Sequence, residues 1–98
     1  AGGGAGAGSL VLPSGERIPL GQQAVTIGRL PDCTIPVNDA NVSRRHAEVR
    51  AAGQGFVLVD LGSTNGSKVN GARIDVQQVL ADGDIVSVGT THLRFEAS

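Results

Sequence analysis

Two short stretches carry most of the side chains in this chain that could bind an anion. Residues 41–47 read NVSRRHA and so place a hydroxyl, two guanidiniums and an imidazole in consecutive positions, while Arg29 follows an apolar run. Residues 61–71, LGSTNGSKVNG, are a turn of small polar residues with open backbone N–H groups. A guanidinium pairs with two oxygens at once, and hydroxyls add further donors. Together these residues predict a site for a compact, highly charged anion, of which phosphate is the obvious candidate.

The bulk composition of the chain limits the kinds of partner that we expect. Its 98 residues suffice for one domain, and the first eight, AGGGAGAG, have the composition of a flexible linker. The folded domain is therefore expected at residues 9–98. A net charge of −1 and only two aromatic residues argue against nucleic-acid binding by charge or by stacking. No apolar run reaches the roughly 20 residues of a membrane-spanning helix, so we expect a cytoplasmic, monomeric domain without a nucleic-acid or membrane partner.

Disulfide, metal and cofactor chemistry are not expected either. Cys33 is the only cysteine, which excludes a disulfide within the chain. The chain also has only two histidines, so the sequence offers too few nitrogen and sulfur ligands for a dedicated zinc site. The sequence therefore predicts no metal site and no cofactor.

The elements that must position the polar stretches are short strands. Apolar runs of three to six residues alternate with turn dipeptides from Ser9 onward, which is typical of an all-β sandwich with loops gathered at its two ends. About 10–12 strands fit this spacing, and only residues 75–81 could form a helical turn. Pro36 marks its short strand as an edge strand. The clearest strands are expected at residues 10–12, 17–20, 25–27, 35–37, 46–51, 56–61, 79–80, 85–88 and 92–96.

Turn signals and alternation refine this arrangement. Asn65-Gly66 and Asn70-Gly71 are strong hairpin signals, because both residue types tolerate positive φ. Asp82-Gly83 marks another turn. In the strand at 46–51, alternation places Ala47, Val49 and Ala51 on one face and His46, Glu48 and Arg50 on the other.

Three motifs in this order resemble those of a forkhead-associated domain. They are Gly-Arg at 28–29, Ser-Arg-Arg-His at 43–46 and Ser-Thr-Asn-Gly at 63–66, and the resemblance extends from Ser9 to Ala97. The family folds as an eleven-stranded, antiparallel or mixed β-sandwich and binds phosphothreonine peptides through loops at one end. The resemblance therefore implies a non-catalytic module, and the composition, which is rich in Ala, Gly and Val and poor in Lys, indicates a bacterial protein. That module would recruit proteins phosphorylated by Ser/Thr kinases, with the kinase or its substrates as partners.

The resemblance also implies a role for each residue of the motifs. The residues expected to bind the phosphate are Arg29, Ser43, Arg44 and Thr64. Asn65 is expected to hold the peptide backbone just after the phosphothreonine, through an amide that both donates and accepts. The residues expected to support the site are Gly28, His46 and Gly66, whereas Arg45 is expected on a solvated face.

Two other functions fit parts of the sequence. Ser43, His46 and Asp60 are the residue types of a hydrolase triad, but no nucleophile elbow accompanies them. Residues 62–68, GSTNGSK, imitate a nucleotide-binding loop but lack its glycine spacing and its following helix. A stronger alternative keeps the same fold and makes the chain a phosphate-independent interaction domain that uses a sheet face. Binding that depends on phosphorylation would distinguish the two.

Overall fold

A computed structural model describes residues 8–53 and 55–97 of the chain, and these residues form strands, turns and loops without a helix. Eleven strands follow one another along the chain, as the sequence predicts for this fold class. Their bounds are β1 Gly8–Val11, β2 Arg17–Leu20, β3 Val25–Gly28, β4 Ile35–Pro36, β5 Ala47–Ala52, β6 Gly55–Asp60, β7 Ser67–Val69, β8 Ala72–Arg73, β9 Gln77–Val79, β10 Ile85–Val88 and β11 Thr91–Ala97.

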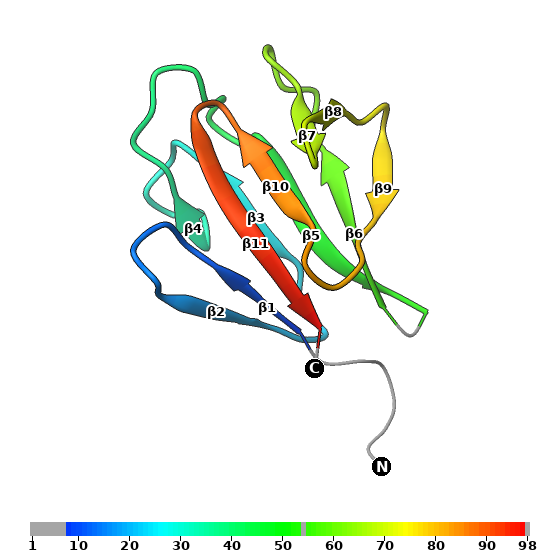
Figure 1. Cartoon of the computed structure of the whole chain (residues 1–98). Coiled ribbons are helices and arrows are strands. Elements are labelled where there is room, and N and C mark those ends of the chain that lie inside the picture. Colours follow the sequence, from blue (N-terminus) through cyan, green and yellow to red (C-terminus); the bar gives the residue numbers. More distant parts are fainter. Residues whose placement is uncertain (1–7, 54, 98) are drawn as a thin grey trace.

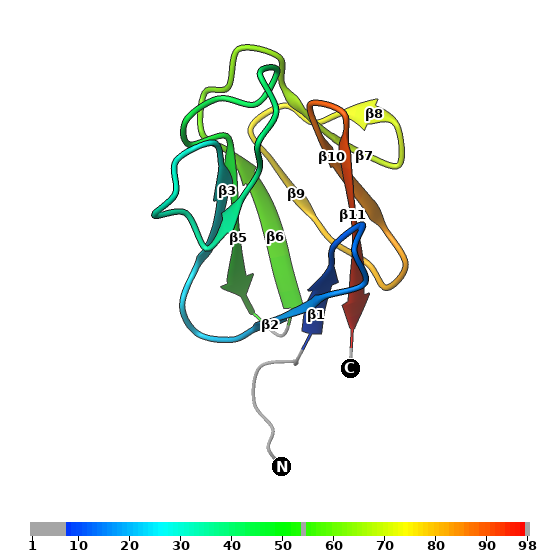
Figure 2. The same cartoon turned by 90° about the vertical axis from the view of Figure 1, so that its left-hand side faces the viewer.

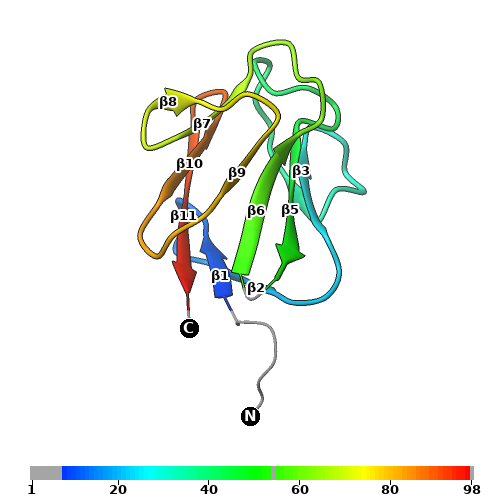
Figure 3. The same ribbon diagram turned by 90° about the vertical axis from the view of Figure 1, so that its right-hand side faces the viewer.

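The strands form two sheets that pack face to face (Figure 1). One sheet has six strands in the order β2-β1-β11-β10-β7-β8, and the other has five in the order β4-β3-β5-β6-β9. β3 and β4 run parallel, whereas their neighbours in the two sheets pair antiparallel. Figures 2 and 3 show the two layers from the side, with the long loops together at one end. The all-β sandwich expected from the sequence is confirmed.

Side chains that alternate along the strands fill the space between the sheets. Leu93 and Phe95 of β11 point inward, as their alternation with polar residues predicts. Phe56 of β6 meets Phe95 edge to face, with ring centroids 5.9 Å apart, and so joins the two sheets. The rest of the core is aliphatic, and its fully buried members include Leu10, Ile27, Val49, Leu58, Val86 and Val88.

Two hairpin predictions have different outcomes. Asn70-Gly71 forms the two-residue turn of the β7–β8 hairpin, with φ of 53° and 85°, and this prediction is confirmed. Asn65-Gly66 is not a hairpin turn, because β6 and β7 lie in different sheets. It belongs instead to the loop that carries the chain from one sheet to the other. The residues of this loop lie outside the strands.

Residues 75–81, the segment where the sequence allows a helical turn, do not form one. The segment contains β9, which pairs with β6 at the edge of the five-stranded sheet. Val57 and Val59 of β6 pair with Val79 and Gln77 of β9. This pairing gives the backbone of the segment hydrogen-bond partners that a single helical turn lacks. Tertiary pairing therefore overrides the local pattern.

The first and last described residues meet at the end of the sandwich opposite the long loops. Gly8 pairs with Ala97 in β11 and is buried beside the rings of Phe56 and Phe95. The sequence places Gly8 in the linker, but the structure makes it the first residue of β1. The remainder of the expected linker, residues 1–7, lies outside the described residues. The part of the chain that the structure describes contains no helix of the length and apolar character that a membrane crossing requires.

Candidate functional site

The loops at one end of the sandwich enclose a small polar hollow of about 180 Å³. The end of β3, the β4–β5 loop and the β6–β7 loop contribute its walls. Its lining residues are Arg29, Ala40, Asn41, Val42, Ser43, Thr64 and Asn65. Four of these are residues that the sequence predicts to bind phosphate or peptide: Arg29, Ser43, Thr64 and Asn65. The hollow is too small for a drug-sized ligand and fits a compact polar group.

Ser43 holds this end of the molecule together through three of its atoms. Its carbonyl oxygen accepts the Arg29 N–H at 3.0 Å, which fixes the backbone from which the Arg29 side chain extends. Its N–H donates to His46 Nδ1 at 3.1 Å. Its Oγ accepts the Thr64 N–H at 3.2 Å. The hydroxyl proton remains available to donate to a group in the hollow.

His46 is fully buried and joins the two motif loops. Because the Ser43 N–H can only donate, Nδ1 of the imidazole must accept, so the proton of the neutral ring lies on Nε2. Nε2 then donates to the Gly66 carbonyl at 2.8 Å. The expected alternation grouped His46 with the outward-facing Glu48 and Arg50. The structure differs because β5 begins only at Ala47 and the loops close over the preceding residue.

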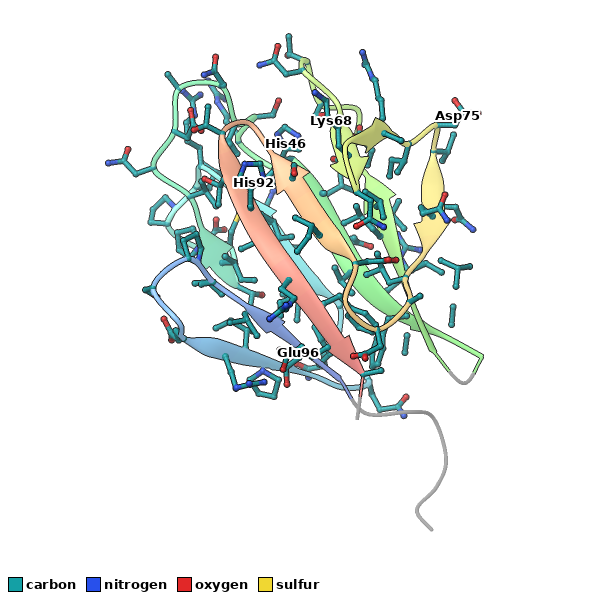
Figure 4. All side chains as sticks on the ribbon, viewed as in Figure 1. His46, Lys68, Asp75, His92 and Glu96 are labelled. Carbon is teal, nitrogen blue, oxygen red and sulfur yellow. The ribbon has the colours of Figure 1, made fainter. Side chains whose placement is uncertain are left out.

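Figure 4 places His46 near the loop end, far from Glu96 at the other end of β11. The imidazole has no free nitrogen that could take a proton from the Ser43 hydroxyl, since both nitrogens hold backbone groups. Asp60 does not bond to the ring, and its carboxylate holds other residues. The hydrolase triad considered from the sequence is therefore absent from this arrangement.

Asp60 organises the β6–β7 loop, and the sequence analysis missed this role. Its carboxylate accepts the N–H groups of Gly62 and Ser63 and the hydroxyls of Ser63 and Ser67, at 2.6–2.9 Å. Burial raises the pKa of Asp60, but the hydrogen bonds from Ser63 and Ser67 outweigh it and hold the pKa below its ordinary value. An Asp with a Gly two residues later and a Ser three residues later is typical of a turn stabilised by its side chain, and this pattern was the available signal.

Asp39 makes the corresponding connection on the opposite side of the loops. Its Oδ1 accepts the Asn41 N–H at 2.9 Å, and its Oδ2 accepts the N–H and the hydroxyl of Thr90 at 2.9 and 2.7 Å. The hydroxyl of Thr90, followed by the N–H groups of Thr90 and Asn41, lowers the pKa of Asp39 to about 2. No local pattern predicts this contact, because the two residues lie far apart in the sequence.

Asn65 connects the two motif loops directly. Its Nδ2 donates to the Asn41 carbonyl at 2.8 Å. Among the described residues its Oδ1 accepts no hydrogen bond, so this oxygen is available to a peptide N–H. Nδ2 thus fixes the orientation of the amide, and Oδ1 can accept a hydrogen bond from a ligand.

Two glycines are required by close packing beneath these loops. A Cβ at residue 28 would overlap the carbonyl oxygen of Arg44, so the strand and the loop approach too closely for any side chain. Gly66 has φ of 81°, and a Cβ there would lie 2.5 Å from Nε of Arg73. Both positions therefore support the loop geometry without contacting a ligand themselves.

The two motif arginines after Ser43 lie outside the lining of the hollow. Arg44 is exposed beside it, and its carbonyl accepts the Leu30 N–H at 3.2 Å. Arg45 is exposed and pairs with Asp32 at 3.1 Å, in keeping with its expected place on a solvated face. Arg29 has no carboxylate within 4.0 Å among the described residues, so its guanidinium is available to an anion.

The polar atoms of the site suit an anion and not a metal ion. Within residues 8–53 and 55–97, no three His, Cys, Asp or Glu side chains come together in a way that could hold a metal. The side chains that line the hollow include a guanidinium, hydroxyls and two amides. The guanidinium and the hydroxyls can donate to oxygen, which is the chemistry that phosphate recognition requires.

The structure is thus a two-sheet β-sandwich domain with an arginine and several hydroxyls in the loops at one end. Comparison with known proteins identifies the class: residues 25–89 match the FHA domain family, and the chain belongs to that family. The resemblance to forkhead-associated domains expected from the sequence is thereby confirmed.

Several relatives support this membership. The chain is 46% identical over 82 residues to the glycogen accumulation regulator GarA of Mycolicibacterium smegmatis, covering 84% of this chain and 51% of GarA. The chain thus spans about half the length of the curated relatives that it matches first. The Corynebacterium jeikeium protein named oxoglutarate dehydrogenase inhibitor is 42% identical over 82 residues, covering 84% of this chain and 56% of that protein.

A solved structure shows the same fold. It belongs to a study of phosphothreonine-dependent FHA domain interactions and superposes with a TM-score of 0.84 at 38% identity. The superposition covers 92% of this chain and 95% of the other.

Proposed function

We propose that this domain is a phosphothreonine-dependent protein–protein interaction module that recruits proteins phosphorylated by Ser/Thr kinases. The observation that carries the proposal is the hollow at the loop end, where Arg29, Ser43 and Thr64 converge. Within the part of the chain that the structure describes, no carboxylate pairs with Arg29. A phosphothreonine brings about −1.5 to −2 charges and three strong acceptor oxygens at neutral pH. In the hollow, the Arg29 guanidinium supplies positive charge, and the hydroxyls of Ser43 and Thr64 supply further donors to these oxygens.

Each residue has a distinct part in this mechanism. Arg29 pairs with two phosphate oxygens, and the Ser43 hydroxyl donates to the third. Because the Thr64 N–H already donates to Ser43 Oγ, Thr64 contributes through its hydroxyl. Asn65 presents Oδ1 to the peptide N–H after the phosphothreonine, and Arg44 adds positive charge from beside the hollow.

The expected affinity is modest. Charge-assisted hydrogen bonds contribute roughly 1.5–3 kcal/mol each, and association costs about 4–15 kcal/mol. A few such bonds with peptide-backbone contacts give a Kd on the order of micromolar. Such an affinity suits a contact that is made and broken as a kinase and a phosphatase act.

The mode of action, the partners and the cellular location that we propose follow from the same chemistry. GarA is named a regulator and the Corynebacterium protein an inhibitor, and we propose likewise that this domain acts by binding and not by catalysis. Its partners would be a Ser/Thr kinase or that kinase's substrates. Because protein phosphorylation uses intracellular ATP, we place the module in the cytoplasm, where it works as a monomeric domain without a cofactor, nucleic acid or membrane.

The test is calorimetric titration with a degenerate phosphothreonine peptide pool and its unphosphorylated twin. We expect heat only from the phosphorylated pool, and we expect Arg29→Ala to abolish it. Arg45→Ala is the matched control, because it removes a nearby exposed arginine that is already paired with Asp32. Equal binding of both pools, or full binding by a folded Arg29→Ala domain, would refute the proposal.

The outer face of the five-stranded sheet offers a second candidate surface. Val79 at its edge is 66% exposed, whereas Val57, its partner on the same face, is only 5% exposed, so Val79 is the accessible residue of the pair. If binding is independent of phosphate, this apolar edge becomes the surface to examine, and Val79→Ser would weaken the interaction whereas Arg29→Ala would not.

A further inference from the structure

The turn between β10 and β11 contacts the β4–β5 loop, although it lies outside the lining of the proposed phosphate site. The N–H and the hydroxyl of Thr90 both donate to Asp39 Oδ2, at 2.9 and 2.7 Å. Gly89 packs against the same loop, since a Cβ there would lie 2.8 Å from Asp39 Oδ2 and 2.8 Å from Val42 Cγ2. Figure 1 shows this turn beside the loop that follows β4. Two residues of the turn are therefore fitted closely to a loop that carries part of the site.

Asp39 joins this turn to the backbone of the β4–β5 loop. Its Oδ1 accepts the Asn41 N–H at 2.9 Å, and its carbonyl oxygen accepts the Val42 N–H at 3.0 Å. Because the hydrogen bonds from Thr90 and Asn41 lower the pKa of Asp39 to about 2, its carboxylate is charged at neutral pH. Hydrogen bonds to a charged acceptor are stronger than those between neutral groups. Asp39 thus holds two consecutive N–H groups of the loop while Thr90 holds its carboxylate.

One peptide unit carries this connection to Asn65. The Val42 N–H and the Asn41 carbonyl belong to the same planar peptide group, in which they point in opposite directions. The N–H donates to the Asp39 carbonyl, and the carbonyl oxygen of the unit accepts Asn65 Nδ2 at 2.8 Å. The position of Asp39 therefore sets the direction of the acceptor that holds the Asn65 amide.

The donors for the phosphate are held by a separate set of hydrogen bonds. Ser43 accepts the N–H groups of Arg29 and Thr64. It donates its own N–H to His46 Nδ1. None of these contacts passes through Asp39. Loss of the contact at Thr90 should therefore disturb Asn65 more than it disturbs the phosphate donors.

We propose that Thr90 is a positioning residue for peptide recognition. Through Asp39 it orients the peptide unit between Asn41 and Val42, and this unit holds the Asn65 amide with Oδ1 free for the ligand. The contact determines how tightly the domain holds the peptide backbone after the phosphothreonine, and it leaves the phosphate contacts unchanged. This inference rests on the proposed phosphothreonine function and assigns the β10–β11 turn a part in it that requires no contact with the ligand.

The first test compares Thr90→Val with Thr90→Ser by calorimetry. Valine keeps the branched shape and removes the hydroxyl, whereas serine keeps the hydroxyl. We expect Thr90→Val to bind the phosphothreonine peptide pool about threefold to tenfold more weakly, and Thr90→Ser to remain within about twofold of the parent domain. Thr34→Val is the matched control, because it removes an exposed threonine hydroxyl that contacts Thr26 instead, and it should keep the parent affinity.

Inorganic phosphate distinguishes the positioning of Asn65 from general damage to the loops. This probe offers phosphate oxygens without a peptide backbone, so its binding reports on the phosphate donors alone. Its titration can be followed by NMR at the amides of Arg29 and Ser43. We expect Thr90→Val to bind inorganic phosphate within about twofold of the parent domain. Equal weakening of phosphate and peptide would overturn the inference, since the loops as a whole would have changed.

A double-mutant cycle tests whether Thr90 acts through Asn65. In Asn65→Ala the amide that Thr90 positions is absent, so adding Thr90→Val should weaken peptide binding by less than about twofold more. A direct contact between Thr90 and the peptide predicts instead that the two losses multiply. Multiplied losses would therefore overturn the inference.

The outcomes also distinguish this inference from the proposed function. Phosphate-dependent binding that is equally tight in the parent domain and in Thr90→Val would overturn the inference alone. Failure of the parent domain to bind any phosphorylated pool would overturn both.

A second variant reaches the same contact from its other side. Asp39→Asn removes the charge that accepts the Thr90 hydroxyl, and it should weaken peptide binding while phosphate binding persists. It replaces Thr90→Val in these tests if that variant does not fold. Full peptide affinity in a folded Asp39→Asn domain would contradict the proposed route.

Discussion

At the scale of single residues, the polar atoms of the site divide between structure and binding. Ser43 gives its carbonyl, its N–H and a lone pair of Oγ to Arg29, His46 and Thr64, and retains one hydroxyl proton. Asn65 uses its Nδ2 within the molecule and leaves its Oδ1 outward. The groups that remain are therefore oriented before a ligand arrives, which lowers the entropic cost of binding.

Replacing Ser43 by Ala should weaken phosphopeptide binding while the fold persists. The variant loses one hydrogen bond to a charged phosphate, for which about 1.5–3 kcal/mol, or roughly 10- to 150-fold in Kd, is the expected cost. Calorimetry with the phosphothreonine pool measures the loss. An unchanged Kd would show that the hydroxyl does not contact the phosphate.

Replacing His46 by Leu should destabilise the domain as well as the site. The Ser43 N–H and the Gly66 carbonyl would both lose their partner, at about 1–3 kcal/mol for each group left unsatisfied. Urea unfolding measures the change in the free energy of unfolding. His92→Leu is the control, since His92 is exposed and the expected change is within about 0.5 kcal/mol. Equal stability of the two variants would contradict the role assigned to His46.

At the scale of elements, the loops depend on the turns and carboxylates that hold them. Gly71 has φ of 85° in the turn that joins β7 to β8. Gly71→Ala should therefore lower the free energy of unfolding by about 1–2 kcal/mol, because a Cβ disfavours the left-handed region. Gly21→Ala is a matched control, as that exposed glycine has no positive φ and no neighbour that a Cβ would meet. Thermal and urea unfolding compare the two, and equal losses would contradict the argument.

The contact of Asp39 with Thr90 should appear in the pH dependence of stability. Hydrogen bonds from Thr90 and Asn41 lower the pKa of Asp39 from 3.8 to about 2 in the folded state. The carboxylate's contribution is therefore complete above about pH 4 and is lost as the pH falls through about 2. We expect Asp39→Asn to show a shallower decline in the free energy of unfolding over that interval than the parent chain. Identical slopes in urea titrations would show that the contact contributes nothing.

Much of the fold could be predicted because the signals are local. The alternation at Leu93 and Phe95, the turn at Asn70-Gly71 and the edge position of Pro36 follow from periodicity and backbone preference. The sequence allows a helical turn at residues 75–81, because β9 forms against an edge of β6 that no local pattern reveals. Asn65-Gly66 was read as a hairpin signal for a similar reason, since only the topology shows that the chain changes sheets there.

The residues of the site also fall into two groups, those that local motifs predict and those that only the structure reveals. Arg29, Ser43, Thr64 and Asn65 could be named from short motifs, and they line one hollow. The contact between Asp39 and Thr90 joins segments that are distant in sequence, so it required the structure. The burial of His46 was missed because strand alternation does not extend into the loops that cover it.

At the scale of the whole molecule, the sandwich separates stability from recognition. The two sheets and their aliphatic core hold the strand ends, and the recognition loops gather at one end, opposite the pairing of Gly8 with Ala97 (Figures 1 and 2). A ligand at the loop end therefore leaves both sheet faces uncovered. Binding at the loops and binding at a sheet face can therefore be distinguished by which residues change their signals when a ligand is added.

The most direct measurement of the central claim is a residue-resolved one. Amide chemical shifts of the isotope-labelled domain would be followed by NMR during titration with the phosphothreonine pool and then with its unphosphorylated twin. We predict that the phosphorylated pool shifts the amides of Arg29, Ser43, Thr64 and Asn65, and that the twin leaves them in place. Shifts confined to the outer face around Val57 and Val79, or equal shifts with both pools, would contradict phosphothreonine recognition at the loops.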